Sequence, residues 1–237
     1  GYDFSNSATG YGGDPNGHGT HVASIIAGDA DGTGMRGVAY DATLYSYRVD
    51  ADGDGTFEAL NTDSQLAAVA RRHITDNIHV SNNSWGSATA VTAYTTSQMR
   101  SIYSRSISAF ADAQAAGTLF VFAAGNSGNS EVSEEAGLPY HAPELVDAWL
   151  VVVASDENGV ETAFTNRCGV AAAFCVTAPG NQVLAADAGT TGYVSLSGTS
   201  MAAPFVSGLA AALMEKFPNE KQHYLDETHR AVKELLP

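Results

Sequence analysis

Short, almost wholly apolar runs alternate with stretches of helical spacing, and this alternation restricts the fold more than any other feature of the chain. Four apolar runs are predicted to form buried strands: 43–49, 78–82, 118–124 and 149–154. Helical spacing of small and apolar residues lies between them, at 64–74 and 97–117. Strands without polar alternation are buried on both faces, as in a parallel sheet covered by helices. The sequence therefore predicts a three-layer α/β/α domain with a mostly parallel central sheet.

The remaining segments complete this domain and set its boundary. Residues 125–145 are polar and rich in Gly, Ser and Glu, which predicts a surface loop, and the short β-like pieces of 173–196 predict hairpins. Residues 200–214 form an apolar, small-residue stretch without a polar face, which predicts a buried helix. From 219 the pattern becomes amphipathic. We therefore predict one domain over 1–218 and an amphipathic C-terminal helix or connector over 219–237.

Charge and composition exclude several classes of protein. The 237 residues include 26 acidic and 11 basic side chains, a net charge of −15, which would repel phosphate backbones and anionic membrane surfaces. We therefore expect no nucleic-acid partner. No run approaches the roughly 18 apolar residues of a spanning helix, and the first residues lack the pattern of a signal peptide. We expect a soluble domain that begins part-way through a longer gene product.

In three segments, glycines and small residues surround a polar group: GHGTHVA at 17–23, AAGNSG at 123–128 and GTSMAAP at 198–204. In the last of these, Ser200 stands at the start of the predicted buried helix. The free N–H groups and the dipole of a helix N-terminus favour developing negative charge, which suits a nucleophilic serine. Serine is also a preferred N-cap residue, and capping alone would explain it.

The other two segments each contain one candidate for proton transfer or oxyanion binding. His18 lies between glycines and could act as a general base near neutral pH, or it could be a structural histidine. A metal-binding pair with His21 lacks further ligands in the sequence, so zinc is not expected. Asn126 follows an apolar run, where its amide could donate to an oxyanion or simply form a turn.

The three segments together resemble the signature blocks of the subtilisin-like serine peptidases. NGHGTHVA, AAGNSG and SGTSMAAP each match one block, in the order of that family, and the resemblance extends over nearly the whole chain up to Met214. It implies that Ser200 is the nucleophile and His18 the general base and acid. It also implies that Asn126 and the Ser200 N–H bind the oxyanion. The implied substrates are proteins or peptides, and no cofactor is required for the reaction.

The resemblance also implies residues that contact the substrate. Two segments resemble the walls of the primary specificity pocket: Ser84, Trp85 and Gly86, and Ala123, Ala124 and Gly125. The segment that begins at Gly53 and includes Gly55 resembles the edge that pairs with a bound peptide. Trp85 could equally be an ordinary core residue, since large aromatic side chains are usually well buried.

The third member of the catalytic triad is absent from its expected place. The family aspartate lies on a strand about 30 residues before the histidine, whereas 17 residues precede His18. Asp3 and Asp14 are too close to serve, and no D-S-G or D-T-G occurs. We expect an upstream segment to carry the aspartate and a central strand, because an unfilled sheet position leaves backbone groups unpaired. That upstream segment or a propeptide is also an expected partner of this chain. The alternative is an inactive relative, such as an adhesin or binding module.

Two cysteines and two neighbouring patterns suggest an exported protein. Cys168 and Cys175 could form a disulfide that closes a small loop, and the alternative is a reduced pair in a cytosolic protein. With NNSWG and DGTGMRGVAYDATLYSYRV, this spacing resembles the subtilisin-like passenger domains of Gram-negative autotransporters. The resemblance implies a secreted or cell-surface location and a passenger linked to a membrane anchor.

Two acidic segments raise the question of calcium. Asp50, Asp52 and Asp54 imitate the start of an EF-hand loop, but Asn61 stands where a bidentate glutamate is needed, so turn chemistry explains them better. Asp29 and Asp31 lie in the loop where many relatives bind calcium. A structural calcium ion at these two residues is therefore a hypothesis that follows from the resemblance.

Overall fold

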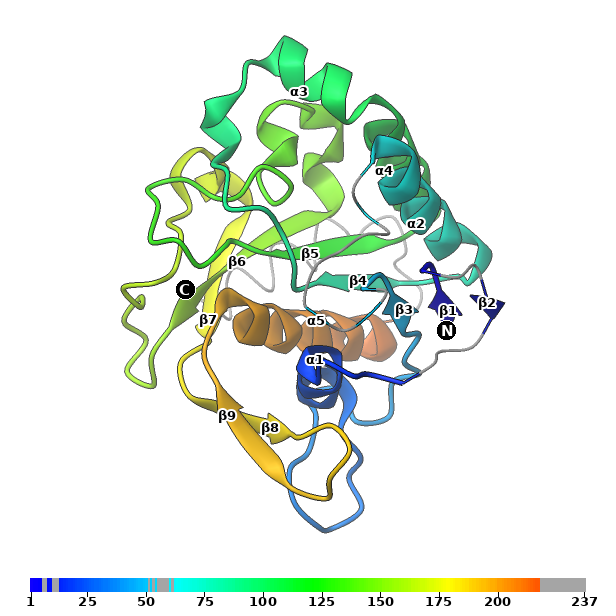
Figure 1. Cartoon of the computed structure of the whole chain (residues 1–237), viewed down its shortest axis with the longest axis vertical. Coiled ribbons are helices and arrows are strands. Elements are labelled where there is room, and N and C mark those ends of the chain that lie inside the picture. The colour runs from blue at the N-terminus through cyan, green and yellow to red at the C-terminus, as the bar shows by residue number, and fades with distance from the viewer. Residues whose placement is uncertain are drawn as a thin grey trace.

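A parallel four-stranded sheet lies between two layers of helices (Figure 1). The computed structural model describes residues 1–5, 8–9, 13–50, 52, 54, 60 and 62–217. The strands are β1 (Tyr2–Asp3), β2 (Ala8–Thr9), β3 (Tyr47–Arg48), β4 (Val80–Asn83), β5 (Leu119–Ala123), β6 (Trp149–Ser155), β7 (Cys175–Pro179), β8 (Val183–Ala186) and β9 (Tyr193–Leu196). The α-helices are α1 (His18–Ala27), α2 (Asp63–Thr75), α3 (Thr96–Ile102), α4 (Ser104–Ala115) and α5 (Thr199–Lys216). The described part of the chain contains no helix with the length and apolar character needed to cross a bilayer.

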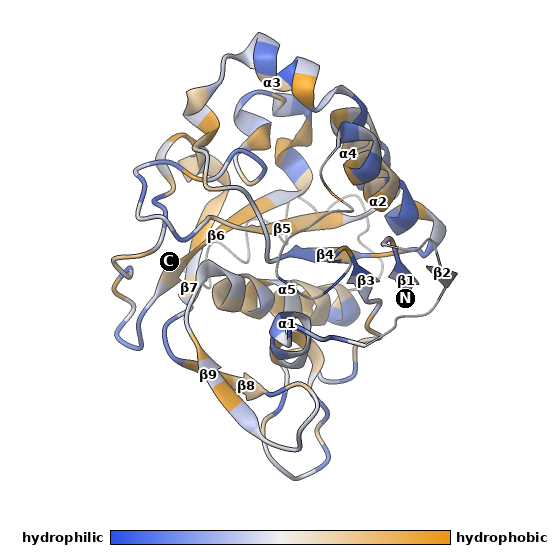
Figure 2. Cartoon of the chain, in the orientation of Figure 1, coloured by the Kyte–Doolittle hydropathy of each residue, from blue (hydrophilic) through white to orange (hydrophobic). Residues whose placement is uncertain are grey.

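The predicted three-layer α/β architecture is confirmed. The order β4-β5-β6-β7 is parallel throughout, with α2, α3 and α4 on one side and α1 and α5 on the other (Figure 1). Every residue of β5 and β6 is buried, and both strands are strongly hydrophobic in Figure 2. The predicted helix at 200–214 is α5, which packs against this sheet and against α1. These strands and helices bury most of the apolar core.

The helix predicted over 97–117 is divided at Tyr103, so a single helix was wrong. Tyr103 has φ −107° and ψ 26°, outside the helical region, and separates α3 from α4. The Asp63 carboxylate accepts hydrogen bonds from the backbone N–H groups of Arg105 at 2.9 Å and Ser106 at 2.8 Å. This long-range cap satisfies the free N–H groups at the start of a new helix.

Residues 125–131 are exposed or half-buried, but most of 132–142 is buried, so the prediction of a surface loop was wrong for this second part. The segment contains the short 3-10 helix η3 (Leu138–Tyr140), and η4 (Pro143–Ala148) begins before it ends. Val132 and Leu138 are fully buried in the core. The segment is polar on average, but its apolar side chains point into the core.

Only part of 173–196 is a hairpin: β8 and β9 pair antiparallel, but β7 joins the main sheet.

The small sheet β2-β1-β3 is separate from the four-stranded sheet among the described residues. Tyr2 N–H and Phe4 N–H donate to the carbonyls of Ser46 and Arg48, both at 2.9 Å. The N–H and C=O groups of successive residues in a strand point to opposite edges, so those of Tyr47 point away from β1. Residues of β3 and β4 line one cavity of about 1590 Å³. Among the described residues, β3 and β4 each have one edge without a partner strand, and both strands line this cavity.

Candidate active site

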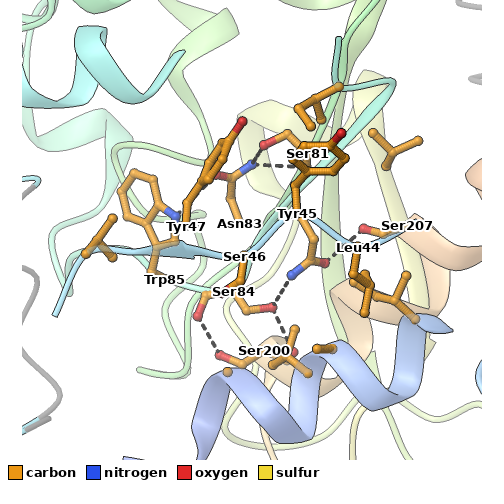
Figure 3. Close-up of a pocket in the computed structure, with 18 of the residues that line it drawn as sticks. Leu44, Tyr45, Ser46, Tyr47, Ser81, Asn83, Ser84, Trp85, Ser200 and Ser207 are labelled. Atoms are coloured by element: carbon orange, nitrogen blue, oxygen red, sulfur yellow. Dashed lines mark hydrogen bonds between the residues drawn. The ribbon is translucent and has the colours of Figure 1, made fainter. Parts of the chain in front are cut away.

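Ser200 is the second residue of α5 and is tied to the end of β4. Its Oγ donates to the Ser84 carbonyl at 3.2 Å, and Ser84 Oγ donates to the Ser200 carbonyl at 2.8 Å (Figure 3). These two hydrogen bonds join segments 116 residues apart in sequence. The N–H groups in the first turn of an α-helix have no partner within the helix, so the Ser200 N–H is available to a bound group. The Ser200 hydroxyl therefore lies half-buried in the cavity wall, beside a helix N-terminus.

Asn126 follows β5 and is held by the residue before Ser200. Its Oδ1 accepts from Thr199 N–H at 2.8 Å and from Thr199 Oγ1 at 3.0 Å. Because a backbone N–H can only donate, the bonded atom of the Asn126 amide must be its oxygen. The exposed Asn126 NH₂ thus remains available to donate to a group in the cavity. Thr199 had not been singled out in the sequence, although it lies inside the GTSMAAP segment.

His18 is the first residue of α1 and lies half-buried in the same cavity. The preceding Gly17 has φ 86°, a conformation that favours glycine. Burial lowers the pKa of His18, while the Asp14 carboxylate partly offsets that effect by raising it. The lowered pKa favours the neutral imidazole, the form that a general base requires.

Asp14 and Asp3 are both engaged with other groups. Asp14 Oδ1 accepts from Gly17 N–H at 2.9 Å and its Oδ2 accepts from Thr20 N–H at 2.6 Å, so the carboxylate caps the start of α1. Burial tends to raise the pKa of Asp14, but these hydrogen bonds and the nearby His18 lower it overall. Asp3 on β1 forms an ion pair with Arg48 on β3, with 3.8 Å between Asp3 Oδ2 and a guanidinium nitrogen of Arg48.

One cavity is thus lined by three of the residues singled out in the sequence, namely His18, Asn126 and Ser200. Asn126 and Ser200 are held in place through Thr199. Among the hydrogen bonds of the described residues, none joins the His18 ring to Ser200 Oγ, because that hydroxyl donates to Ser84. Proton transfer to His18 requires the hydroxyl to turn from this carbonyl towards the imidazole.

The segments implied as pocket walls reach the cavity in part. Gly86, Ala123 and Gly125 line it with Ser84. Ala124 is fully buried in the core, so its side chain is not on the cavity wall. Trp85 lines the cavity and also packs on the core, with its ring centroid 5.5 Å from that of Phe122. Gly53 and Gly55, implied as part of a peptide-binding edge, lie outside the described residues.

The acidic segments have local partners. Asp31 Oδ1 accepts from Thr33 N–H at 2.9 Å and Thr33 Oγ1 at 2.8 Å, and Asp29 is exposed. Neither residue belongs to a group of three or more possible ligands in the described structure. Asp50, Asp52 and Asp54 do bring carboxylate oxygens within 4.8 Å of one another, at a half-buried or exposed position. Asp54 N–H donates to Asp52 Oδ1 at 3.2 Å, as in an ordinary turn.

A disulfide joins Cys168 and Cys175, with an S–S distance of 2.00 Å. It connects the start of the 3-10 helix η5 (Gly169–Phe174) to the first residue of β7. The bridge therefore fixes the outer strand of the four-stranded sheet, away from the cavity residues.

Known proteins resemble this chain in sequence and in structure. The model of the subtilase family matches residues 1–236. An extracellular serine protease of Serratia marcescens is 32% identical over 85% of this chain. Subtilisin DY of Bacillus licheniformis is 35% identical over 90% of this chain. The chain spans 24% of the length of the Serratia protein and 68% of that of subtilisin DY.

Solved structures show the same architecture. A cold-adapted subtilisin-like serine proteinase superimposes with a TM-score of 0.70 at 27% identity, covering 96% of this chain and 71% of that structure. The self-cleaved protease domain of PatA gives a TM-score of 0.70 at 29% identity, covering 94% of this chain and 76% of its own.

Proposed function

Because this chain belongs to the subtilase family, we propose that it is a serine endopeptidase with Ser200 as nucleophile. One observation carries the proposal: Thr199 binds the Asn126 carbonyl oxygen, which leaves the Asn126 NH₂ and the helix N-terminal N–H of Ser200 beside the Ser200 hydroxyl. Two donors beside a nucleophile form an oxyanion hole. The neutral His18 lines the same cavity as the base.

The reaction follows from these positions. Ser200 Oγ attacks the carbonyl carbon of the scissile peptide bond, and its proton passes to His18. Asn126 and the Ser200 N–H stabilise the oxyanion of the tetrahedral intermediate. The C–N bond then breaks as His18 protonates the leaving amine, which leaves an acyl ester on Ser200. His18 next takes a proton from water, the hydroxide attacks the ester, and the proton returns to Ser200 as the acid product leaves.

We assign the missing acid of the triad to a further strand between β3 and β4. The facing edges of these strands and the continuous cavity that reaches His18 support this position. An aspartate at the end of that strand would orient the His18 ring and stabilise its protonated form. The strand would come from an upstream segment of the same gene product.

We infer that the protein is exported and acts on protein or peptide substrates. Its similarity to an extracellular protease and its disulfide both support export. We further propose a passenger domain linked to a membrane anchor, on the sequence resemblance described above. The hydrolysis needs no cofactor. Calcium binding at Asp29 and Asp31 finds no support in the geometry, since Asp31 is occupied by Thr33. An unchanged melting temperature in EDTA would dismiss it.

A fluorophosphonate probe tests the assignment of the nucleophile. In the complete gene product we expect Ser200 to be labelled, and Ser200→Ala to abolish both labelling and casein hydrolysis. Ser195→Ala, at an exposed position of β9, is the matched control and should change neither. An unlabelled and inactive wild type with the upstream strand in place would favour the alternative of an inactive binding module.

A further inference from the structure

The backbone on both sides of Asn126 is bound by one distant residue, Asn166. The Asn166 N–H donates to the Gly125 carbonyl at 2.9 Å, and Ser127 N–H donates to Asn166 Oδ1 at 3.0 Å. Asn129 N–H donates to the same oxygen at 3.1 Å. Asn166 therefore holds the chain immediately before Asn126 and immediately after it.

The Asn166 side chain is fixed in one orientation. Its Oδ1 accepts from two backbone N–H groups, which can only donate, so this atom must be the amide oxygen. Its Nδ2 donates to the Ala124 carbonyl at 3.1 Å. The residue is 0% exposed, and an unpaired polar group at such a position costs about 1–3 kcal/mol. Rotation of the amide would leave all three of these groups without their partners.

Gly125 permits the close approach of Asn166. It has φ 108°, a conformation that side chains rarely adopt, and a Cβ atom placed there would lie 2.4 Å from Asn166 Nδ2. Any larger residue at position 125 would displace the Asn166 amide. Asn126 follows directly in the chain, so its backbone begins from a position that Asn166 sets.

Two further backbone hydrogen bonds join the same two segments. Gly128 N–H donates to the Phe164 carbonyl and Arg167 N–H donates to the Asn129 carbonyl, both at 2.8 Å. Residues 126–128 are exposed, so they have little packing of their own to hold them. Their conformation therefore depends on hydrogen bonds to segment 164–167, in which Asn166 makes the most.

Asn126 thus has two separate anchors. Thr199 binds its amide oxygen, and Asn166 binds the backbone around it. We propose that Asn166 is a positioning residue that places the Asn126 NH₂ beside the Ser200 N–H for oxyanion binding. The inference rests on the proposed peptidase function. A displacement of about 1 Å at a reacting centre can lower the rate by about 10²-fold, so a buried residue behind the site can control turnover.

Amide hydrogen exchange on this chain tests the placement of the loop without any catalysis. Asn166→Leu replaces the amide by an apolar group of similar size, and the Ser127 and Asn129 N–H groups should exchange about tenfold faster or more. Thr165→Val is the control. Thr165 is also 0% exposed, and its hydroxyl accepts from Ala154 N–H on β6 at 3.0 Å and donates to the Asn166 carbonyl. Its loss should destabilise the fold while the Asn166 side chain keeps its partners and the loop stays protected.

Kinetics in the complete gene product test the effect on the reaction. Asn166→Leu should lower kcat by about 10–100-fold with little change in KM, whereas Thr165→Val should change kcat by less than about twofold. Asn166→Asp keeps an oxygen for Ser127 and Asn129 but loses the donor to Ala124, so it should lower kcat by a smaller factor. With Asn126→Asp already present, Asn166→Leu should have little further effect, since the donor that it positions is gone.

Several results would overturn the proposal. They are an unchanged kcat in Asn166→Leu, loop amides that exchange at the wild-type rate in that variant, or a kcat loss that multiplies in full with that of Asn126→Asp. If Asn166→Leu does not fold, an unchanged kcat in Asn166→Asp has the same meaning. A wild type that cleaves nothing, with loop amides protected in wild type and freed in Asn166→Leu, would instead refute the peptidase function and uphold the placement of the loop by Asn166.

Discussion

The two sides of the cavity are built differently. On one side, β5 and β6 are five and seven residues long, entirely buried and paired with neighbours on both edges. On the other side, β1 and β3 are two residues long, and β3 pairs on one edge only among the described residues. A strand that lacks a neighbour also lacks half of its backbone hydrogen bonds and much of its burial. Extended structure is therefore shorter on the side where β3 has one partner strand among the described residues.

This difference separates the parts of the proposed catalytic machinery. Asn126 and Ser200 both belong to the side of the cavity built by β5, β6 and α5, which we call the complete side. Here β5 and α5 pack together in the core, and Thr199 joins Asn126 to the start of α5. His18 starts α1, on the same face of the sheet as α5, and lines the cavity that is also lined by residues of β3 and β4. The proposed nucleophile and oxyanion donors therefore all come from described residues of this chain. Completion of the base depends on what occupies the gap.

The largest effect on stability is expected from Phe122→Ala on the complete side. Phe122 is fully buried, and its ring is stacked on Trp149 with centroids 4.5 Å apart. Truncation should lower the free energy of unfolding by about 3–5 kcal/mol, measured by denaturant titration. Leu44→Ala, at a 46%-exposed residue near β3, should change it by less than about 0.5 kcal/mol. Equal losses at both positions would contradict the contrast between the two sides.

Asn126→Asp tests the oxyanion hole without removing its anchor. The carboxylate can still accept from Thr199, but it offers no donor and adds a negative charge beside the developing oxyanion. In the complete gene product kcat should fall by at least about 10²–10³-fold, the range for loss of one oxyanion donor. KM should change little, because the interaction forms in the transition state. A large rise in KM with kcat unchanged would assign Asn126 to substrate binding instead.

Removing the disulfide should lower the free energy of unfolding by less than Phe122→Ala does. The bridge joins residues seven positions apart, and closure of so short a loop contributes about 2–3 kcal/mol through the unfolded chain. The double variant Cys168→Ser and Cys175→Ser should therefore unfold at a lower temperature than wild type. The melting temperature of the wild type in reductant should match that of the variant, and reductant should not change the melting temperature of the variant. Equal melting temperatures for wild type and variant would show that the bridge does not stabilise the fold.

The sequence predicted the complete side better than the incomplete one. The apolar runs 118–124 and 149–154 correspond closely to β5 and β6, because both have neighbours on each edge. The run 43–49 is also predicted to be a strand, yet only Tyr47 and Arg48 are in one. Composition measures the tendency of a segment to be buried. Strand formation also needs a partner, and local sequence does not contain that information.

The site shows the same limit. His18, Asn126 and Ser200 could be identified because each stands in a distinctive local block, but Thr199 as the anchor of Asn126 depends on a contact across 73 positions. Asn166 lies outside these blocks, and its contacts with the loop after β5 follow from the tertiary fold alone. The polarity of residues 125–145 predicted exposure, whereas Val132 and Ser133 among them are buried.

The smallest predicted effect concerns His18, which lies between the two sides. Asp14 raises the pKa of His18 against the larger lowering by burial, so Asp14→Asn should lower that pKa further. The base is active when deprotonated, and the acid limb of kcat/KM against pH should therefore move to lower pH. Asp29→Asn removes a comparable charge at an exposed position and controls for the net charge of the protein.

Asp14→Asn should also alter stability with a distinct pH dependence. The pKa of Asp14 is lowered from 3.8 in the folded state, so its stabilising effect is present above that value and is lost as the pH falls through the lower folded pKa. The variant should therefore be less stable than wild type at neutral pH, and the difference should shrink in acid. A shift of the acid limb to higher pH would show that Asp14 does not act on His18 as a nearby negative charge. In that case the tuning of His18 would have to come from the group that occupies the gap between β3 and β4.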